Sequence, residues 1–122
     1  MIEQMVGKVF DRVYRGDYNA NYCSGEALIF ENSTERFVFT HQQDCCELVY
    51  IEDIEGDLEY LVGTEILNAE ESTSYGETSE WGDSSTWTFY KFATIKGYVD
   101  VRWYGTSNGY YSESVDLFHE KL

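Results

Sequence analysis

The sequence predicts an α+β fold: a mainly antiparallel β-sheet with a C-terminal three-stranded meander and one or two short helices. Three observations lead to this prediction. The last third of the chain alternates polar and apolar residues, short polar turns separate the alternating segments, and two segments space their apolar residues as one face of a helix does. With 122 residues and no internal repeat, the chain has the length of one domain, residues 1–122.

The N-terminal part is expected to contain a helical turn, a strand, a loop and a β-hairpin. Apolar residues at helical spacing begin at Ile2, but Gly7 interrupts them, so a short helical turn should lead into a strand. The glycines, asparagines and aspartate of residues 15–25 predict a loop. Residues 26–31 and 35–41 predict the two strands of a hairpin that a short polar turn joins.

The middle of the chain is expected to hold one short helix and two less regular segments. Residues 53–61 place three apolar side chains on one helical face, and Asp53 is in position to cap that helix. Residues 64–74 are expected to be extended, and residues 75–85 have the composition of a loop.

The last third predicts the three strands of the meander, over residues 86–95, 98–104 and 111–117. In the first of these strands the alternation predicts that Trp87 and Phe89 face the core. In the second strand, Val99, Val101 and Trp103 oppose Asp100 and Arg102, and in the third Val115 and Leu117 are expected to point inward.

Composition excludes several classes of protein. There are 23 acidic and 8 basic residues, which gives a formal net charge of -15, and aromatic residues make up 17% of the chain. Disordered acidic tails are poor in aromatic residues, so this chain is expected to fold. A polyanion is a poor ligand for nucleic-acid polymers or anionic membranes. The small size and the aromatic content favour a homo-oligomer.

No segment predicts membrane insertion or export. The longest uninterrupted apolar stretches are about four residues, such as residues 27–30, which is far below the about 20 of a membrane helix. The N-terminus does not resemble a secretory signal. Three cysteines without a framework spacing fit a reducing compartment, so a cytoplasmic location is expected.

The charges are distributed unevenly along the chain. No lysine or arginine lies between Arg36 and Lys91, and thirteen acids fall in the interval from Asp44 to Asp83. Such an interval predicts a strongly negative surface. It is compatible with an ordinary solvated face and with a protein that imitates DNA in order to block a nuclease.

The sequence offers little to support catalysis or a cofactor. His41, Asp44, Cys45 and Cys46 lie within six residues, but their spacing is wrong for the usual zinc sites, and a tight loop with one buried thiol is the simpler interpretation. No hydrolase, phosphate-loop or metalloprotease motif is present. We therefore expect a binding protein without catalytic residues, metal or cofactor.

One turn is a candidate ligand site. Asn108 and Gly109 form a strong turn signal between Ser107 and two tyrosines, Tyr110 and Tyr111. A plain hairpin turn with exposed tyrosines explains this pattern. With Arg102 and Trp103 one strand earlier, the same residues supply a cation, aromatic rings and an amide, a combination that suits a nucleotide-like ligand.

Two groups of motifs resemble a known family. Residues 43–47 read QDCCE and are followed by IEDIEGDL at 51–58, while TIKG at 94–97 is followed by RWYGTSNGYYS at 102–112. Over about residues 37–115 the chain resembles a family of small phage and prophage proteins with a "DCC" loop and a "SNGYYS" turn. The Thoeris anti-defence proteins lie within or close to this family.

The resemblance implies a sponge. Such proteins bind a cyclic ADP-ribose isomer made by bacterial TIR-domain enzymes and hold it without cleaving it, in the cytoplasm of the infected bacterial host.

A sponge needs a cation or backbone amides for the pyrophosphate and an aromatic ring for the adenine. On this physical ground we predict Arg36 and Arg102 at the phosphates and Trp103 or Phe89 against the base. The turn would contact ribose or base edges, and a pocket shared by two subunits would enclose the ligand. The residues of the turn in this predicted site are Ser107, Asn108, Tyr110 and Tyr111.

Overall fold

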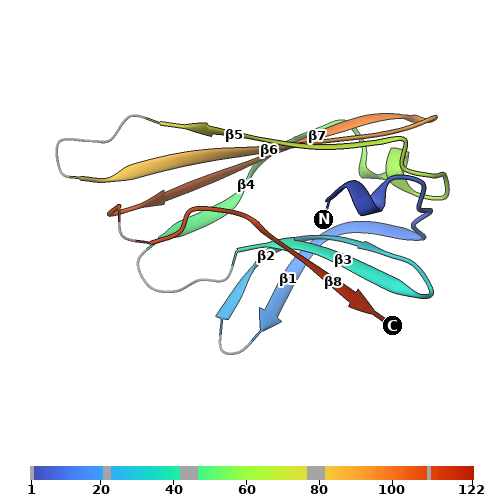
Figure 1. Cartoon of the computed structure of the whole chain (residues 1–122), viewed down its shortest axis with the longest axis horizontal. Coiled ribbons are helices and arrows are strands. Elements are labelled where there is room, and N and C mark those ends of the chain that lie inside the picture. The colour runs from blue at the N-terminus through green and yellow to red at the C-terminus, as the bar shows by residue number, and fades with distance from the viewer. Residues whose placement is uncertain (1, 21–22, 42–46, 77–81, 110) are drawn as a thin grey trace.

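Eight segments form β-strands, and they pair into two antiparallel four-stranded sheets that pack face to face (Figure 1). The computed structural model describes residues 2–20, 23–41, 47–76, 82–109 and 111–122. One sheet has the strand order β1-β2-β3-β8 and the other β4-β7-β6-β5. The elements are η1 (Ile2–Met5), β1 (Arg12–Ala20), β2 (Cys23–Glu31), β3 (Glu35–Thr40), β4 (Leu48–Glu55), η2 (Leu58–Leu61), β5 (Asn68–Tyr75), β6 (Ser84–Thr94), β7 (Gly97–Ser107) and β8 (Asp116–Lys121).

The prediction of an α+β fold is wrong in its helical part, because the helices of the described residues are two four-residue 3-10 turns, η1 and η2. The helical spacing at the N-terminus ends after one turn, and Gly7 adopts a positive φ of 88° there. In the predicted helix over residues 53–61, residues 53–55 continue β4 and pair with β7 instead. Asp57, rather than Asp53, caps the remaining turn by accepting a hydrogen bond from the backbone N–H of Glu59. The described part of the chain has no helix with the length and hydropathy that crossing a bilayer requires.

The strands β1, β2 and β3 form two consecutive hairpins, of which the sequence predicted the second but not the first. The predicted hairpin over residues 26–41 is confirmed as β2 and β3, and Asn32 stabilises its turn by accepting hydrogen bonds from the backbone N–H groups of Thr34 and Glu35. The loop predicted for residues 15–25 is wrong, because β1 pairs with β2 as far as Ala20 and Cys23. The adjacent β2 supplies a complete ladder of partners, which outweighs the local turn composition.

The predicted C-terminal meander is also wrong in its third strand. β6 and β7 form the expected hairpin across the turn at residues 95–96, but β8 begins only at Asp116 and pairs with β3 in the other sheet. Residues 111–115, which we call the connecting segment, carry the chain from one sheet to the other (Figure 1). Local alternation along a strand does not contain the information about which sheet that strand joins.

Aromatic rings from both sheets fill the space between them. The ring centroids of Phe30 and Phe92 lie 4.9 Å apart, and those of Phe39 and Tyr90 lie 4.7 Å apart, so each pair joins the two sheets. Phe37 and Phe39 lie on the same core-facing side of β3. Burying such rings supplies most of the stability of a small domain.

The core-facing side of β6 is the opposite of the predicted one. Tyr90 and Phe92 point into the core, whereas Trp87 and Phe89 are half-buried on the outer face of the sheet. Both sides of this strand carry large apolar residues in the sequence. Lys91 is the residue that distinguishes the two sides, because it lies on the same side as Trp87 and Phe89 and marks that side as the outer one. In β7 the prediction is confirmed, because Val99, Val101 and Trp103 are buried in the core.

Candidate functional site

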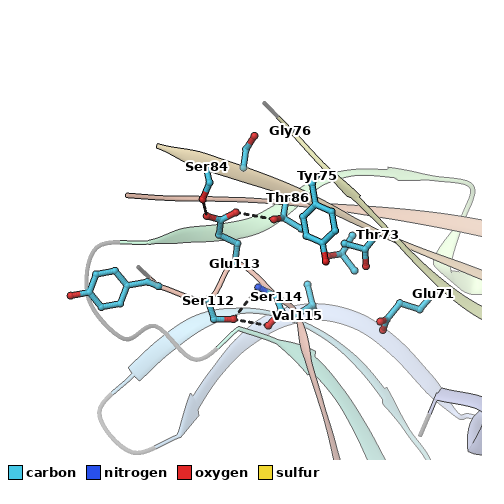
Figure 2. A pocket seen from close by; sticks show the side chains of 13 residues that line it. Glu71, Thr73, Tyr75, Gly76, Ser84, Thr86, Ser112, Glu113, Ser114 and Val115 are labelled. Atoms are coloured by element: carbon cyan, nitrogen blue, oxygen red, sulfur yellow. Dashed lines mark hydrogen bonds between the residues drawn. The ribbon is translucent and has the colours of Figure 1, made fainter. Parts of the chain in front are cut away.

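A pocket of about 420 Å³ lies between the strands β5 and β6 and the connecting segment, toward the end of β6 opposite to the one that contacts η2. The ends of β5 and β6 form one wall, and the connecting segment forms the other (Figure 2). Hydroxyl groups make up most of its polar lining. The lining residues are Glu71, Thr73, Tyr75, Gly76, Ser84, Ser85, Thr86, Thr88, Tyr111, Ser112, Glu113, Ser114 and Val115.

Glu113 is the central polar residue of this pocket and is only 9% exposed. Its Oε1 accepts a hydrogen bond from Thr86 Oγ1 at 2.8 Å, and its Oε2 accepts from the hydroxyls of Ser84 and Ser107. These three donors come from β6 and β7, so the carboxylate ties the connecting segment to the end of the β6–β7 hairpin. A buried carboxylate requires such partners, because an unpaired charge in this position is strongly unfavourable.

The surroundings of Glu113 act on its pKa in opposite directions. Burial by itself raises the pKa of the carboxyl group, whereas the three hydroxyl donors stabilise the charged form, and the net pKa is lowered below 4.5. Glu113 is therefore ionised at neutral pH and places a fixed negative charge on the wall of the pocket.

A second buried contact holds the connecting segment from its other side. His41 Nδ1 lies 2.8 Å from the carbonyl oxygen of Ser114, and its Nε2 lies 3.0 Å from Glu47 Oε1. Because a carbonyl oxygen only accepts, the hydrogen-bond network assigns a proton to Nδ1. The wall of the pocket is thus fixed by Glu113 on one side and by His41 on the other.

The connecting segment approaches β7 closely at Gly105. A Cβ atom at this position would lie 2.7 Å from the carbonyl oxygen of Glu113, 2.9 Å from its Cβ and 3.1 Å from Val49 Cγ2. Glycine is therefore the residue that allows the segment to reach the hydroxyl groups of β6 and β7.

We expect Gly105→Ala to displace the connecting segment and to lower the free energy of unfolding by about 1–3 kcal/mol, because a backbone carbonyl has to move. Chemical denaturation of the variant and the wild type measures this difference. Gly82→Ala is a control, since a Cβ there meets no atom within 4 Å, although its φ of 84° adds a separate backbone cost. A Gly105→Ala variant with wild-type stability would contradict the close approach.

Two tyrosines and a second carboxylate also line the pocket. Tyr75 is 80% exposed at the end of β5, and Tyr111 lies on the connecting segment. Glu71 lines the inner side of β5 opposite Tyr90, whose pKa is raised mainly by burial and further by the charge of Glu71. No lysine or arginine is among the described lining residues, so the pocket has a negative potential.

The structure brings part of the predicted site to this pocket. Tyr111 lines it, and Ser107 lies directly beside it, with its hydroxyl bound to Glu113. The hydroxyl of Ser107 also accepts a hydrogen bond from the backbone N–H of Gly109, whose φ is 93°, which agrees with the predicted turn. Asn108 is exposed in this turn. Tyr110 lies outside the described residues, as do Cys45 and Cys46.

Arg36 is remote from the pocket and from Arg102. It projects from the outer face of the β1-β2-β3-β8 sheet, because its neighbour Phe37 points into the core. Its guanidinium pairs with Glu31 at 3.1 Å and with Glu120 at 3.2 Å, and the hydrogen bond to Glu31 raises its pKa. Arg102 projects from the outer face of the other sheet, so the two arginines do not converge on one phosphate.

Phe89 and Arg102 lie together, but Trp103 does not join them. Phe89 and Arg102 are cross-strand partners that line a shallow hollow of about 150 Å³ on the outer face. Arg102 Nε lies 2.7 Å from Glu52 Oε1 in an ion pair, although the two groups are not aligned as a hydrogen bond. Trp103 is 1% exposed in the core, which corrects its prediction as a stacking surface.

The sequence prediction missed Glu113, Thr86, Ser84 and Tyr75. Glu113 was one of 23 acids, and nothing in its neighbourhood marked it as buried. The run of hydroxyl residues at 84–86 supplies two of its donors, but hydroxyls at the start of a strand also bond to water, so the sequence carried no signal for this contact.

The residues of this pocket and of the strands β1 to β7 fall inside a known family. A family model described as a domain of unknown function, DUF7448, matches residues 3–117. The chain belongs to the DUF7448 family. Comparisons of this DUF7448 chain with curated proteins and with solved structures find no match. In its described residues, no group of three or more His, Cys, Asp or Glu side chains is arranged to hold a metal ion.

Proposed function

We propose that this protein binds a nucleoside-like small molecule in the pocket beside Glu113 and holds it without chemical change. The observation that carries this proposal is the pocket itself, with about 420 Å³ of space, a hydroxyl-rich wall and two tyrosines among its lining residues. A volume of this size lies within the range of small-molecule sites, about 300–1,000 Å³.

The chemistry of the wall selects for hydroxyl groups and a flat ring. Ser85, Thr73 and Thr88 each present a hydroxyl that can donate to or accept from ribose oxygens. Tyr75 and Tyr111 supply aromatic faces against which a base can stack. Holding such a ligand requires no acid–base pair, which fits a binding role.

The charge of the pocket determines how a phosphate-bearing ligand would sit. Glu113 and Glu71 repel an anion, and no described lining residue offers a compensating cation. The base and the riboses would therefore enter the pocket, while the phosphates would remain at the mouth in water. Arg36 and Arg102 take no part in this arrangement.

The resemblance to the phage and prophage family with the "DCC" loop and "SNGYYS" turn indicates the biological form of this activity. In that form the protein is an anti-defence sponge that sequesters a cyclic ADP-ribose isomer of TIR-based immunity in the cytoplasm of the infected host. The exposed Tyr75 in the lining of the pocket and the location of Tyr111 within the SNGYYS motif support this proposal.

Binding is expected to depend on the two tyrosines. Tyr75→Ala or Tyr111→Ala should weaken the capture of a cyclic ADP-ribose isomer about tenfold or more, because stacking contributes about 1–3 kcal/mol per base. Isothermal titration and ligand-induced thermal stabilisation measure the affinity. Tyr98→Ala is the matched control, because Tyr98 is 72% exposed and remote from the pocket.

The fate of the ligand separates a sponge from an enzyme. Heating the complex should release the ligand intact, which mass spectrometry detects directly. A hydrolysed product would show catalysis, and the absence of stabilisation by every cyclic ADP-ribose isomer would contradict the proposed ligand.

A second candidate function is inhibition of a host nuclease by an acidic surface that imitates DNA. The observation that favours it is that β4 and β5, the two edge strands of one sheet, both expose carboxylates. A mimic should bind a basic nuclease with an affinity that falls steeply with salt, and it should show no stabilisation by small nucleotides.

A further inference from the structure

The carboxylate of Glu71 marks one end of the Glu113 pocket, which we call the inner end. Glu71 and Thr73 share one side of β5 (Figure 2), and their cross-strand partners on β6 are Tyr90 and Thr88. No lysine, arginine or histidine in the described part of the chain forms an ion pair with Glu71. Because Glu71 is also exposed, its two oxygens are open to a ligand.

Beside Glu71, the hydroxyl of Tyr90 is a buried donor without an acceptor. Tyr90 is 0% exposed, and its hydroxyl has no hydrogen-bond partner among the described residues, so it is not aligned with Glu71 as a hydrogen bond. Burial, and further the charge of Glu71, raises the pKa of Tyr90, so the phenol keeps its proton at neutral pH. Buried polar groups without a partner are rare in folded proteins. The inner end thus has an acceptor and a donor that the chain itself leaves incomplete.

Glu71 and Glu113 are the two carboxylates of the described lining, and they differ in what they still accept. The oxygens of Glu113 already accept hydrogen bonds from three hydroxyl groups of the chain. Glu71 is therefore the carboxylate that a ligand can use. A carboxylate only accepts, so the matching ligand group has to carry O–H or N–H bonds.

Hydroxyl groups suit the inner end better than an amino group does. An amino group only donates, whereas a hydroxyl donates to Glu71 and also accepts from the hydroxyls of Thr73 and Thr88. The vicinal hydroxyls of a ribose can donate to both oxygens of one carboxylate, and acidic residues hold ribose in this way in dinucleotide-binding folds. Tyr75 lies four residues from Glu71, about 13 Å along the strand. A ligand whose base stacks on Tyr75 therefore directs its sugar, rather than its base, toward Glu71.

We propose that Glu71 binds the vicinal hydroxyls of the ligand's ribose and makes the pocket specific for ribonucleosides. This inference rests on the proposed binding of a nucleoside-like molecule and adds its orientation. The base lies against Tyr75, the 2′ and 3′ hydroxyls lie at the inner end, and the 5′ side is directed away from Glu71.

This orientation makes the position of a phosphate group decisive. A phosphate on the 2′ oxygen would lie against the carboxylate of Glu71, and no described lining residue supplies a cation to offset the repulsion. A phosphate on the 5′ oxygen would point away from Glu71 and remain in water. The two isomers carry the same base and the same charge, so a difference between them reports on the contact at the inner end.

The test compares four ligands on the full chain by isothermal titration and by thermal stabilisation: adenosine, 2′-deoxyadenosine, adenosine 5′-monophosphate and adenosine 2′-monophosphate. Removing the 2′ hydroxyl should weaken binding about tenfold, because a hydrogen bond to a charged acceptor is lost. Adenosine 2′-monophosphate should bind at least about tenfold more weakly than its 5′ isomer.

Two glutamine variants identify the carboxylate responsible. Glu71→Gln should bind adenosine more weakly than the wild type and should lose most of the discrimination against adenosine 2′-monophosphate. Glu70→Gln is the matched control, because Glu70 is the adjacent residue of β5, pairs across the strands with Lys91 on the outer side, and loses the same charge. It should keep the wild-type ratios. Circular dichroism confirms that both variants are folded.

The outcomes separate this inference from the proposed function. Equal affinity for adenosine and 2′-deoxyadenosine would overturn the inference and leave nucleoside binding intact. Unchanged discrimination between the two phosphate isomers in Glu71→Gln would do the same. If none of the four ligands binds the wild type, the proposed nucleoside pocket itself is wrong.

Discussion

Trp103→Ala is expected to lower the free energy of unfolding by about 3–5 kcal/mol, because it empties a buried tryptophan site between the two sheets. Trp103 is 1% exposed and belongs to the cluster that includes Phe30, Phe92 and Val101. Equilibrium denaturation in urea gives the difference. For a domain of this size the expected change is a large part of the total stability of about 5–15 kcal/mol.

Trp103→Phe separates a core role from a ligand-binding role. Phenylalanine keeps an apolar ring in the site, so this variant should retain more stability than Trp103→Ala and should capture the ligand like the wild type. A Trp103→Ala variant of normal stability that no longer binds ligand would instead place this ring at the binding site.

Glu113→Ala is expected to lower the free energy of unfolding by about 3 kcal/mol, because three hydroxyl groups lose a charged acceptor. The hydroxyls of Ser84, Thr86 and Ser107 would then have to find water inside the pocket. Glu113→Gln keeps the shape and one acceptor oxygen, so its effect should be intermediate. Thermal unfolding at neutral pH compares the three proteins, and equal melting temperatures would show that the carboxylate does not hold the connecting segment.

The stabilising effect of Glu113 should depend on pH. Its pKa in the folded protein is lowered from 4.5, so its ionised form favours the folded state. This contribution is fully present above about pH 4.5 and is lost as the pH falls through the lower pKa of the folded protein. The difference in melting temperature between the wild type and Glu113→Gln should therefore shrink on acidification, whereas a difference that stays constant would contradict the lowered pKa.

The hairpins could be predicted from the sequence where a turn motif is flanked by segments in which polar and apolar residues alternate. Residues 26–41 combine two alternating strands with a polar turn at Asn32, and the structure has the hairpin there. The core-facing side of β7 was also predictable, because Asp100 and Arg102 mark its outer side. The core-facing side of β6 was not, since threonines face the core beside Tyr90 while Trp87 and Phe89 lie outside.

The long-range arrangement could not be predicted, for a physical reason. Pairing between β8 and β3 joins residues about 80 positions apart, and no local pattern specifies that choice. The same limit applies to the site. The turn motif identified Ser107 and Tyr111. The burial of Glu113, in contrast, follows from the path of the connecting segment, and that path is defined only once both sheets have paired.

The crossing of the connecting segment from one sheet to the other also has a consequence for the order of events during translation. The strands β1, β2 and β3 leave the ribosome early, but the free edge of β3 stays unpaired until residues 116–121 have been synthesised. During that interval the nascent chain exposes a strand edge beside Phe37 and Phe39, which is a known risk for aggregation. The acids of residues 47–76 emerge within the same interval, and their mutual repulsion keeps neighbouring nascent chains apart until the last strand closes the sheet.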